Sequence, residues 1–566
     1  MALRTRRLLY TGCFCLLLFL LACPAKAEAK THLEVTCSAA GGGPVIVRSS
    51  KAGLIAEIPG SWDASALVFR IEGADSFYIG DTHIMNGEPF DAAEYIGKTV
   101  TISTAKKRRI GRLTILQGSK IPGIFLTVDE KELKLVNKSK DNMIAEGHVT
   151  VTEADGTVSY DGGLTHFRGR GNATFAYSKK PYELKLEKST AIGGIDRGRT
   201  WLLIANYLDN SLLRNQIVLD LSRQIGLPFA LECAPADLWI NGNYNGLYLM
   251  TEKVQIKKTR LDIFDLEEAA QAVNDQPVNT YPRYDTEDGF LPLMCGYEVP
   301  NDPEDITGGY IFTVEKPHRL NSARKPGFRT ENSLSIRIKE PTCPSPAMVE
   351  YLGGLINRMQ KAIMAPDGND PETGKNYKEF LDVTSFAKKF LIEDLSKNYD
   401  AVSGSQFMFK NADRYDPLIY AGPSWDYDMS FGNVASRGGS PNKDYAAIVT
   451  VGPCNLYKQL SKQEDFMDAV AKSWREDLRP ALAILLGETE APEGSAIRSF
   501  EDYRAAIGPS AEMNFRRWPA SRILTHNVTA RSRNPVKELR VWEDSADGLL
   551  NWIVRRVEYM DGRYAE

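Results

Sequence analysis

The stretch YAGPSWDYDMSFGN, residues 420–433, brings two carboxylates to the end of an apolar segment. An apolar, strand-like approach from Leu418 to Trp425 leads into Asp426 and Asp428, and a Phe-Gly pair then ends the element. Asp favours loops and strand ends for local reasons, so the stretch alone also fits a structural turn. Two neighbouring acids can instead bind Mg²⁺ and orient a hydroxyl group.

A further acid precedes this stretch in DLSKNYDAVSGSQFMFK, residues 394–410. We expect a helix to end at Asn398, so that Asp400 lies in the following loop, six residues before Gln406. Phosphoryl transfer needs a positioning carboxylate, one or two metal-binding groups and a cation for the phosphates. The two stretches together supply the carboxylates.

Cations come from FRGRGNATFAYSKKPYELKLEK, residues 167–188, where glycines alternate with Arg168 and Arg170. A glycine-rich turn lets backbone N–H groups approach a phosphate closely. In the following strand, alternation puts Glu183 and Lys185 on the polar face. An exposed hairpin explains this pattern equally well, so the motif is weak by itself.

The composition is that of a soluble globular protein. The chain has 566 residues, of which 43% are hydrophobic and 25% charged, with a net charge of −4. This length predicts two to four domains. The small net charge argues against broad affinity for nucleic acid or membranes, and we expect no transmembrane helix in the mature chain.

The first residues have the pattern of an export signal. Three arginines precede an apolar run, and LLAC, which ends at Cys23, resembles a bacterial lipobox. We therefore expect a lipoprotein-type signal peptide over residues 1–22. A lipidated Cys23 would then anchor an exported protein to the membrane of the cell envelope, in the periplasm or at the surface. The alternative is ordinary cleavage after AKA, residues 25–27.

The rest of the chain predicts an α+β protein. Short β-branched runs over 31–118 indicate a small all-β, sandwich-like domain. Strands are expected again from 124, including LKLVN at 133–137, followed by a helix over 211–226 with Ser211 as its N-cap. The acidic segment 266–307 has the composition of an insertion or linker, and helices dominate from 345.

Six ordered motifs resemble the CotH kinase family, named for spore coat protein H, from about residue 124 to the C-terminus. They are FRGRGNATF with KKPYELKLEK, WLLIANYLDNSLLRNQIVLDLSRQIGL, LWINGNYNGLYLMTEKV, GGYIFTVEK, LSKNYDAVSGSQFMFK and SWDYDMSFG. The resemblance implies a two-lobed, protein-kinase-like domain over 124–566. Its β-rich N-lobe would cover about 124–340 and its helical C-lobe about 345–566.

The resemblance also implies a role for each matching residue. Asp400 is similar to the catalytic-loop aspartate, and Asp426 to the metal-binding aspartate. Asp428 would be a second ligand or a structural acid. Lys185 would hold phosphate, with Lys180 as its rival, while Arg168 and Arg170 would line the phosphate turn. Glu252 would lie near the hinge or the adenine end. ATP with Mg²⁺ or Mn²⁺ is the implied cofactor.

The chain departs from the family where Gln406 replaces the usual Asn, a change that weakens the expected metal site. Two functions follow. One is an exported kinase that phosphorylates Ser or Thr of a surface or secreted protein, with a lipid anchor as its only membrane contact and no nucleic-acid partner. The other is a catalytically inactive, kinase-like surface protein that acts as a binding or adhesion module.

Overall fold

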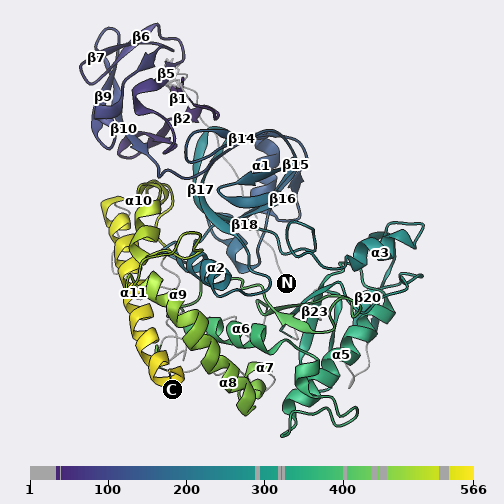
Figure 1. The fold of residues 1–566 in the computed structure, drawn as a ribbon. Helices are drawn as coiled ribbons and strands as arrows, with labels where there is room; N and C mark the ends of the chain where they lie inside the picture. Colours follow the sequence, from purple (N-terminus) through teal and green to yellow (C-terminus); the bar gives the residue numbers. More distant parts are fainter. Residues whose placement is uncertain are drawn as a thin grey trace, which may run out of the picture.

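The computed structural model has a mixed α+β architecture: a β domain, a barrel, a second sheet and a set of helices (Figure 1). It describes residues 33–38, 40–286, 294–316, 320, 325–398, 404–434, 444–446, 456–521 and 535–565. The predicted signal peptide, Cys23 and Asp400 lie outside these ranges. Within them, no helix has the length and apolar character needed to span a bilayer.

The N-terminal domain consists of two sheets with one core between them. Its core is shared with the rest of the chain, because Trp62 stacks on Phe125 at 6.2 Å and Trp239 donates a 2.9 Å hydrogen bond to the Glu57 carbonyl. The first sheet has the order β2 (Val45–Ile46), β1 (Leu33–Cys37), β5 (Leu67–Ile71), β8 (Pro89–Phe90). The second has the order β3 (Arg48–Ser50), β4 (Gly53–Ile58), β10 (Arg109–Gln117), β9 (Thr99–Thr104), β6 (Ser76–Ile79), β7 (Thr82–Met85).

A closed seven-stranded barrel follows, which the sequence did not predict. It closes because β14 pairs with both β13 and β15, so none of its seven strands has a free edge. Its interior is apolar and includes Trp201. The order is β14 (Val158–Gly169), β13 (His148–Thr152), β11 (Gly123–Thr127), β17 (Cys233–Ile240), β18 (Asn243–Glu252), β16 (Ile195–Ile204), β15 (Tyr182–Ile192), with β12 (Met143–Ile144) outside on β14.

Two local predictions were wrong. The segment LKLVN is part of helix α1 (Glu130–Lys138), because Asp129 caps it by accepting hydrogen bonds from the backbone of Lys131 and Glu132. Helix α2 (Arg214–Gln224) begins three residues after Ser211, since the side chain of Asp209 accepts from the Arg214 N–H.

The second sheet has seven strands, and the acidic segment 266–307 contributes two of them together with α3 (Leu266–Ala272). The described residues of that segment are therefore part of the folded architecture and not a linker. The strand order is β19 (Arg283–Thr286), β20 (Met294–Tyr297), β22 (Gly327–Arg329), β23 (Ser335–Glu340), β21 (Tyr310–Val314), β24 (Phe407–Lys410), β25 (Ile419–Ala421).

Helices dominate the C-terminal part, as predicted, and pack into one large apolar core. Helix α5 lies on the second sheet, while α10 packs against β18 of the barrel (Figure 1). The helices are α5 (Pro346–Met364), α6 (Val383–Ser396), α7 (Leu456–Leu460), α8 (Glu464–Ser473), α9 (Arg479–Leu485), α10 (Phe500–Arg517) and α11 (Pro535–Tyr564).

Candidate active site

The polar face of β15 carries a buried carboxylate surrounded by cations. Glu183 is directly opposite Arg168 on β14, and its Oε1 accepts hydrogen bonds from Arg168 Nη2 at 3.0 Å and His166 Nε2 at 2.9 Å. Lys253 Nζ lies 3.8 Å from the same oxygen. The barrel thus holds one acid between three basic side chains.

The charge state of Glu183 follows from these contacts. Burial by itself raises the pKa of its carboxyl group, but the His166 hydrogen bond and the charges of Lys253 and Arg168 outweigh burial and lower the pKa to about 2. Glu183 is therefore ionised at neutral pH and holds Arg168 in place.

The glycine-rich turn meets the acidic loop through Arg170. Its guanidinium lies over the Trp425 ring, 5.2 Å from the centroid, and interacts electrostatically with Asp426 and Glu183. Burial lowers the pKa of Arg170, and the two carboxylates oppose that shift. The structure therefore brings together Arg168, Arg170 and Asp426, which the sequence had assigned to one site.

Two further cations come from β23 of the second sheet and were missed in the sequence. Arg337 and Lys339 are half-buried, and neither forms a hydrogen bond or ion pair with a described residue. Lys339 Nζ instead lies 5.5 Å from the centre of the Phe407 ring. The alternation in SIRIKE, where Ile336 and Ile338 are buried, was the available signal for a cationic face.

These cations repel one another. Burial, assisted by the charges of Arg337, Lys325 and Arg170 and opposed by that of Glu315, lowers the pKa of Lys339 to about 7. We call Arg168, Arg170, Lys253, Arg337 and Lys339 the cationic cluster. A polyanionic ligand would relieve their mutual repulsion, because the five cations outnumber the carboxylates that interact with them, which are those of Glu183, Asp426, Glu315 and Glu340.

Helix α2 fixes the loop that carries Asp426. The Asn215 side chain accepts a 2.7 Å hydrogen bond from the Tyr427 N–H, and Arg214 Nε donates one of 3.0 Å to the Ser430 carbonyl. Arg214 is itself paired with buried Asp209 at 2.5 Å. The motif NYLDNSLLRN, which also fits an ordinary loop and cap, therefore supports the acidic loop.

Asp426 is exposed and has a left-handed backbone with φ of 69°, an uncommon conformation outside glycine. It lies five residues beyond β25, which is shorter than the predicted strand because it ends at Ala421. Asp428 is 8% exposed, and its carbonyl accepts a hydrogen bond from Asn433. Asp426 is therefore the acid directed toward solvent beside the cationic cluster.

Three other predicted site residues are placed apart from this cluster. Glu252 is on the opposite face of the barrel sheet from Glu183 and pairs with Arg260 at 2.6 Å. Lys180 donates to the Phe175 carbonyl at 2.7 Å. Gln406 is buried on the α6 side of the second sheet, where its amide influences the Tyr457 hydroxyl.

Lys185 remains on the same barrel face as Glu183, two residues along β15, and is half-buried. Its ammonium group forms no hydrogen bond or ion pair with a residue that the structure describes. Lys185 is therefore available to an anionic ligand, whereas Lys180 already has a backbone acceptor.

A metal–nucleotide complex fits this arrangement better than a free metal ion does. Within the described ranges, no three His, Cys, Asp or Glu side chains converge to hold a metal ion. Mg²⁺ is usually bound by one or two carboxylates together with the phosphates of its nucleotide. One exposed acid, Asp426, beside a cluster of cations matches that mode.

These features bring an exposed acid and a cluster of basic side chains together in a mixed α+β protein. The family model described as CotH kinase protein matches residues 167–560, which is most of the chain. The chain belongs to this family, as the motifs indicated, and membership points to an atypical kinase-like function. No curated protein matches the sequence.

Proposed function

We propose that the protein is an exported atypical protein kinase that transfers the γ-phosphoryl group of ATP to Ser or Thr of surface or secreted proteins. The observation that carries the proposal is the placement of Asp426 against Arg170. A metal-binding acid beside phosphate-binding cations is the arrangement that phosphoryl transfer requires. We also propose that the barrel and the helical region correspond to the two lobes of a kinase-like domain.

Each residue has a defined task in this proposal. Asp426 holds Mg²⁺ or Mn²⁺, which when bound neutralises phosphate charge. Arg168 and Arg170 bind phosphate oxygens from the barrel, and Lys339 binds them from the second sheet. Asp400 accepts the proton of the substrate hydroxyl as its oxygen bonds to the γ-phosphorus and ADP departs. Lys185 contributes a further charge on the barrel face.

Asp428 supports the acidic loop or adds a second metal contact, and Glu252 supports the barrel end through Arg260. Lys180 would need to leave the Phe175 carbonyl in order to contact phosphate. These residues are therefore assigned supporting roles, and Lys339 takes the position of the principal phosphate-binding lysine.

The proposal includes a membrane anchor at Cys23 and a location in the bacterial cell envelope. Cells labelled with palmitate should incorporate the label into the wild-type protein and not into Cys23→Ser. Label retained by Cys23→Ser would contradict the lipid anchor but would leave the kinase proposal standing, because the site lies in residues 167–560.

A second function, nucleotide binding without catalysis, is favoured by the position of Gln406. Its side chain lies toward Tyr457, on the opposite side of the second sheet from Arg337 and Lys339. A kinase with a metal ligand missing would bind nucleotide and transfer phosphate slowly. In that case the protein serves as a binding or adhesion module.

Autophosphorylation with labelled ATP and Mn²⁺ separates the two functions. Wild type should incorporate label, while Asp400→Ala and Asp426→Ala should not. Glu187→Gln, an exposed change on β15, provides the matched control. If the wild-type protein binds ATP but incorporates no label, the kinase function is contradicted and the binding function is supported.

A further inference from the structure

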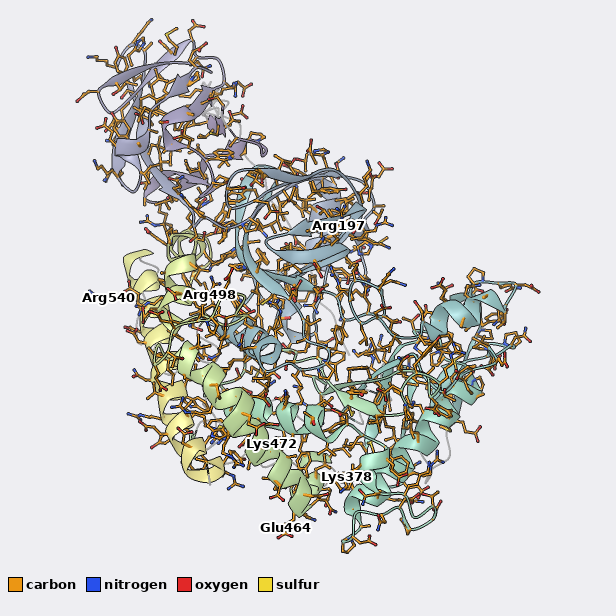
Figure 2. The ribbon with its side chains drawn as sticks, in the orientation of Figure 1. Arg197, Lys378, Glu464, Lys472, Arg498 and Arg540 are labelled. Atoms are coloured by element: carbon orange, nitrogen blue, oxygen red, sulfur yellow. The ribbon has the colours of Figure 1, made fainter. Side chains whose placement is uncertain are left out.

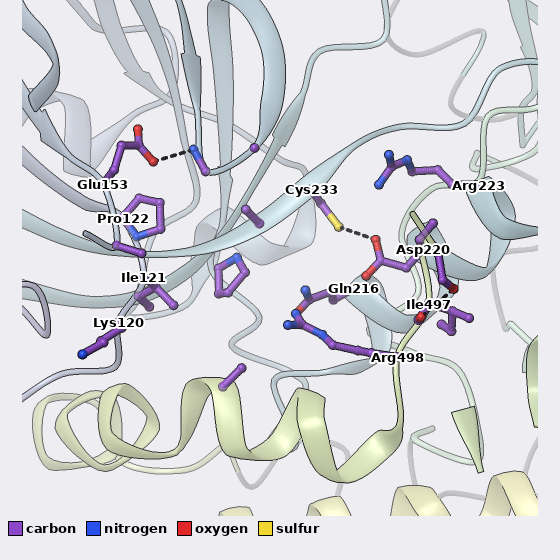
Figure 3. A pocket seen from close by; sticks show the side chains of 18 of the residues that line it. Lys120, Ile121, Pro122, Glu153, Gln216, Asp220, Arg223, Cys233, Ile497 and Arg498 are labelled. Atoms are coloured by element: carbon purple, nitrogen blue, oxygen red, sulfur yellow. Dashed lines mark hydrogen bonds between the residues drawn. The ribbon is translucent and has the colours of Figure 1, made fainter. Parts of the chain in front are cut away.

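A cavity lies between α2 and strand β17 of the barrel, apart from the cationic cluster (Figure 3). Its volume is about 660 Å³, which is in the range of small-ligand sites. Its walls come from α2, β17, the turn between β15 and β16, and the segment leading into α10. None of its lining residues belongs to the cationic cluster.

The cavity contains a guanidinium that the protein leaves without a hydrogen-bonded acid. Arg498 stacks on the Tyr503 ring at 4.5 Å, yet it donates no hydrogen bond to any residue in the described ranges. Arg498 lies in the segment leading into α10 (Figure 2), near Asp220 of α2. Stacking orients the guanidinium and keeps its N–H donors directed at the cavity.

The neighbouring charged side chains, Arg223 and Asp220, already have partners within the protein. Arg223 pairs with Glu232 at 2.9 Å. The Asp220 carboxylate accepts from the Tyr503 hydroxyl at 2.7 Å and from the Cys233 thiol at 3.7 Å. Asp220 also interacts electrostatically with Arg498 and Arg223, but it forms no hydrogen bond with Arg498. The N–H donors of Arg498 therefore remain for a ligand.

A buried amide supplies the second, independent feature. Gln216 on α2 is 3% exposed, and its side chain has no hydrogen-bond partner among the residues described. Figure 3 shows the Gln216 amide and the Arg498 guanidinium directed into the cavity. The amide group of this largely buried side chain faces the cavity and has no partner there among the described residues, so its donors and acceptor are available to a ligand.

We propose that this cavity binds a carboxylate next to an amide, the chemistry of an N-acyl amino acid or of a peptide C-terminus. Arg498 would hold the carboxylate through two N–H donors, and Gln216 would pair with the adjacent peptide group. The N–H donors of one guanidinium match one carboxylate. The acids Asp220, Glu153 and Asp155 along the walls disfavour more highly charged anions such as phosphate.

Ligand-observed NMR on the full chain tests the proposal with N-acetylglycine and its neutral counterpart N-acetylglycinamide. N-acetylglycine should bind and the amide should not. Arg498→Gln should weaken binding by roughly tenfold or more, because a charged hydrogen bond is lost. Arg504→Gln should have no effect, since Arg504 pairs with Asp547 outside the cavity.

A longer probe, acetyl-triglycine, identifies the source of the carboxylate. Tighter binding than N-acetylglycine points to a peptide C-terminus, and equal binding points to a small acyl amino acid. Gln216→Leu provides a second variant that keeps the arginine and should also weaken binding. Equal binding of acid and amide, binding unchanged in Arg498→Gln, preference for inorganic phosphate, or no binding at tens of millimolar would each overturn the proposal.

Discussion

The guanidinium of Arg170 stacks on the indole of Trp425, with 5.2 Å between them, and this contact joins the barrel to the acidic loop. The two residues come from motifs far apart in the chain, RGRG and SWDYD. Their contact sets how far Asp426 lies from the arginines of the barrel. A mutation that removes this contact therefore tests the proposed nucleotide site directly.

Replacing Trp425 with Leu should weaken binding of a non-hydrolysable ATP analogue by roughly fivefold, because a cation–π contact is worth about 1 kcal/mol. Calorimetric titration in the presence of Mn²⁺ measures the loss. Tyr415→Leu removes an aromatic ring that is 65% exposed and serves as control. Equal affinities for wild type and Trp425→Leu would show that the stack does not position Arg170 for nucleotide.

Nucleotide affinity should fall as the pH rises above 7, because the pKa of Lys339 is lowered to about 7 by burial and by neighbouring cations. Below this pH the ammonium is charged and attracts phosphate, while above it the neutral amine does not. Lys339→Arg keeps its charge at all these pH values and should flatten the profile.

Titrations of the ATP analogue between pH 6 and 9 check this prediction, since ionisation of the analogue itself affects both proteins equally. Lys339→Met should lose affinity at pH 6 and little at pH 9. If the affinity of the wild type depends on pH in the same way as that of Lys339→Arg, then Lys339 does not bind the phosphates. In that case Lys185 becomes the principal phosphate-binding lysine.

Glu183→Gln should lower the free energy of unfolding at neutral pH and should make that free energy less dependent on pH in the acidic range. The pKa of Glu183 is about 2 in the folded protein and ordinarily near 4.5, so its contribution is complete above pH 4.5 and disappears as the pH falls toward 2. The shift corresponds to at most about 3 kcal/mol. Urea unfolding at several pH values should show a wild-type advantage that shrinks on acidification, and Glu187→Gln should show none.

Arg214→Met should destabilise the protein by about 3–5 kcal/mol, because it leaves the carboxylate of Asp209 buried without its cation. The variant also loses the hydrogen bond to the Ser430 carbonyl and should loosen the acidic loop. Thermal unfolding measures the first effect and ATP-analogue affinity the second. Arg516→Met, in a more exposed pair with Glu512, should cost no more than about 1 kcal/mol.

Several parts of the site could be predicted from the sequence because they are local. Alternation placed Glu183 and Lys185 on the polar face of one strand, and composition predicted the helices after residue 345. The order of motifs identified the family. Local patterns gave the wrong secondary structure where a single capping side chain decides it. Residues 133–137 were predicted as a strand but are helical, because Asp129 caps the helix.

Only the tertiary structure decided which cations surround Asp426. Barrel closure pairs β14 with β15 and sets Arg168 opposite Glu183, and the second sheet adds Arg337 and Lys339 from a segment without a recognisable motif. The sequence by itself determined the family, the acidic loop and the helical C-terminal region, because these depend on neighbouring residues. Strand pairing between distant segments depends on the whole fold. Only this pairing shows that Glu252 lies on the opposite face of the barrel sheet from Glu183 and that Lys339 lies near Arg170.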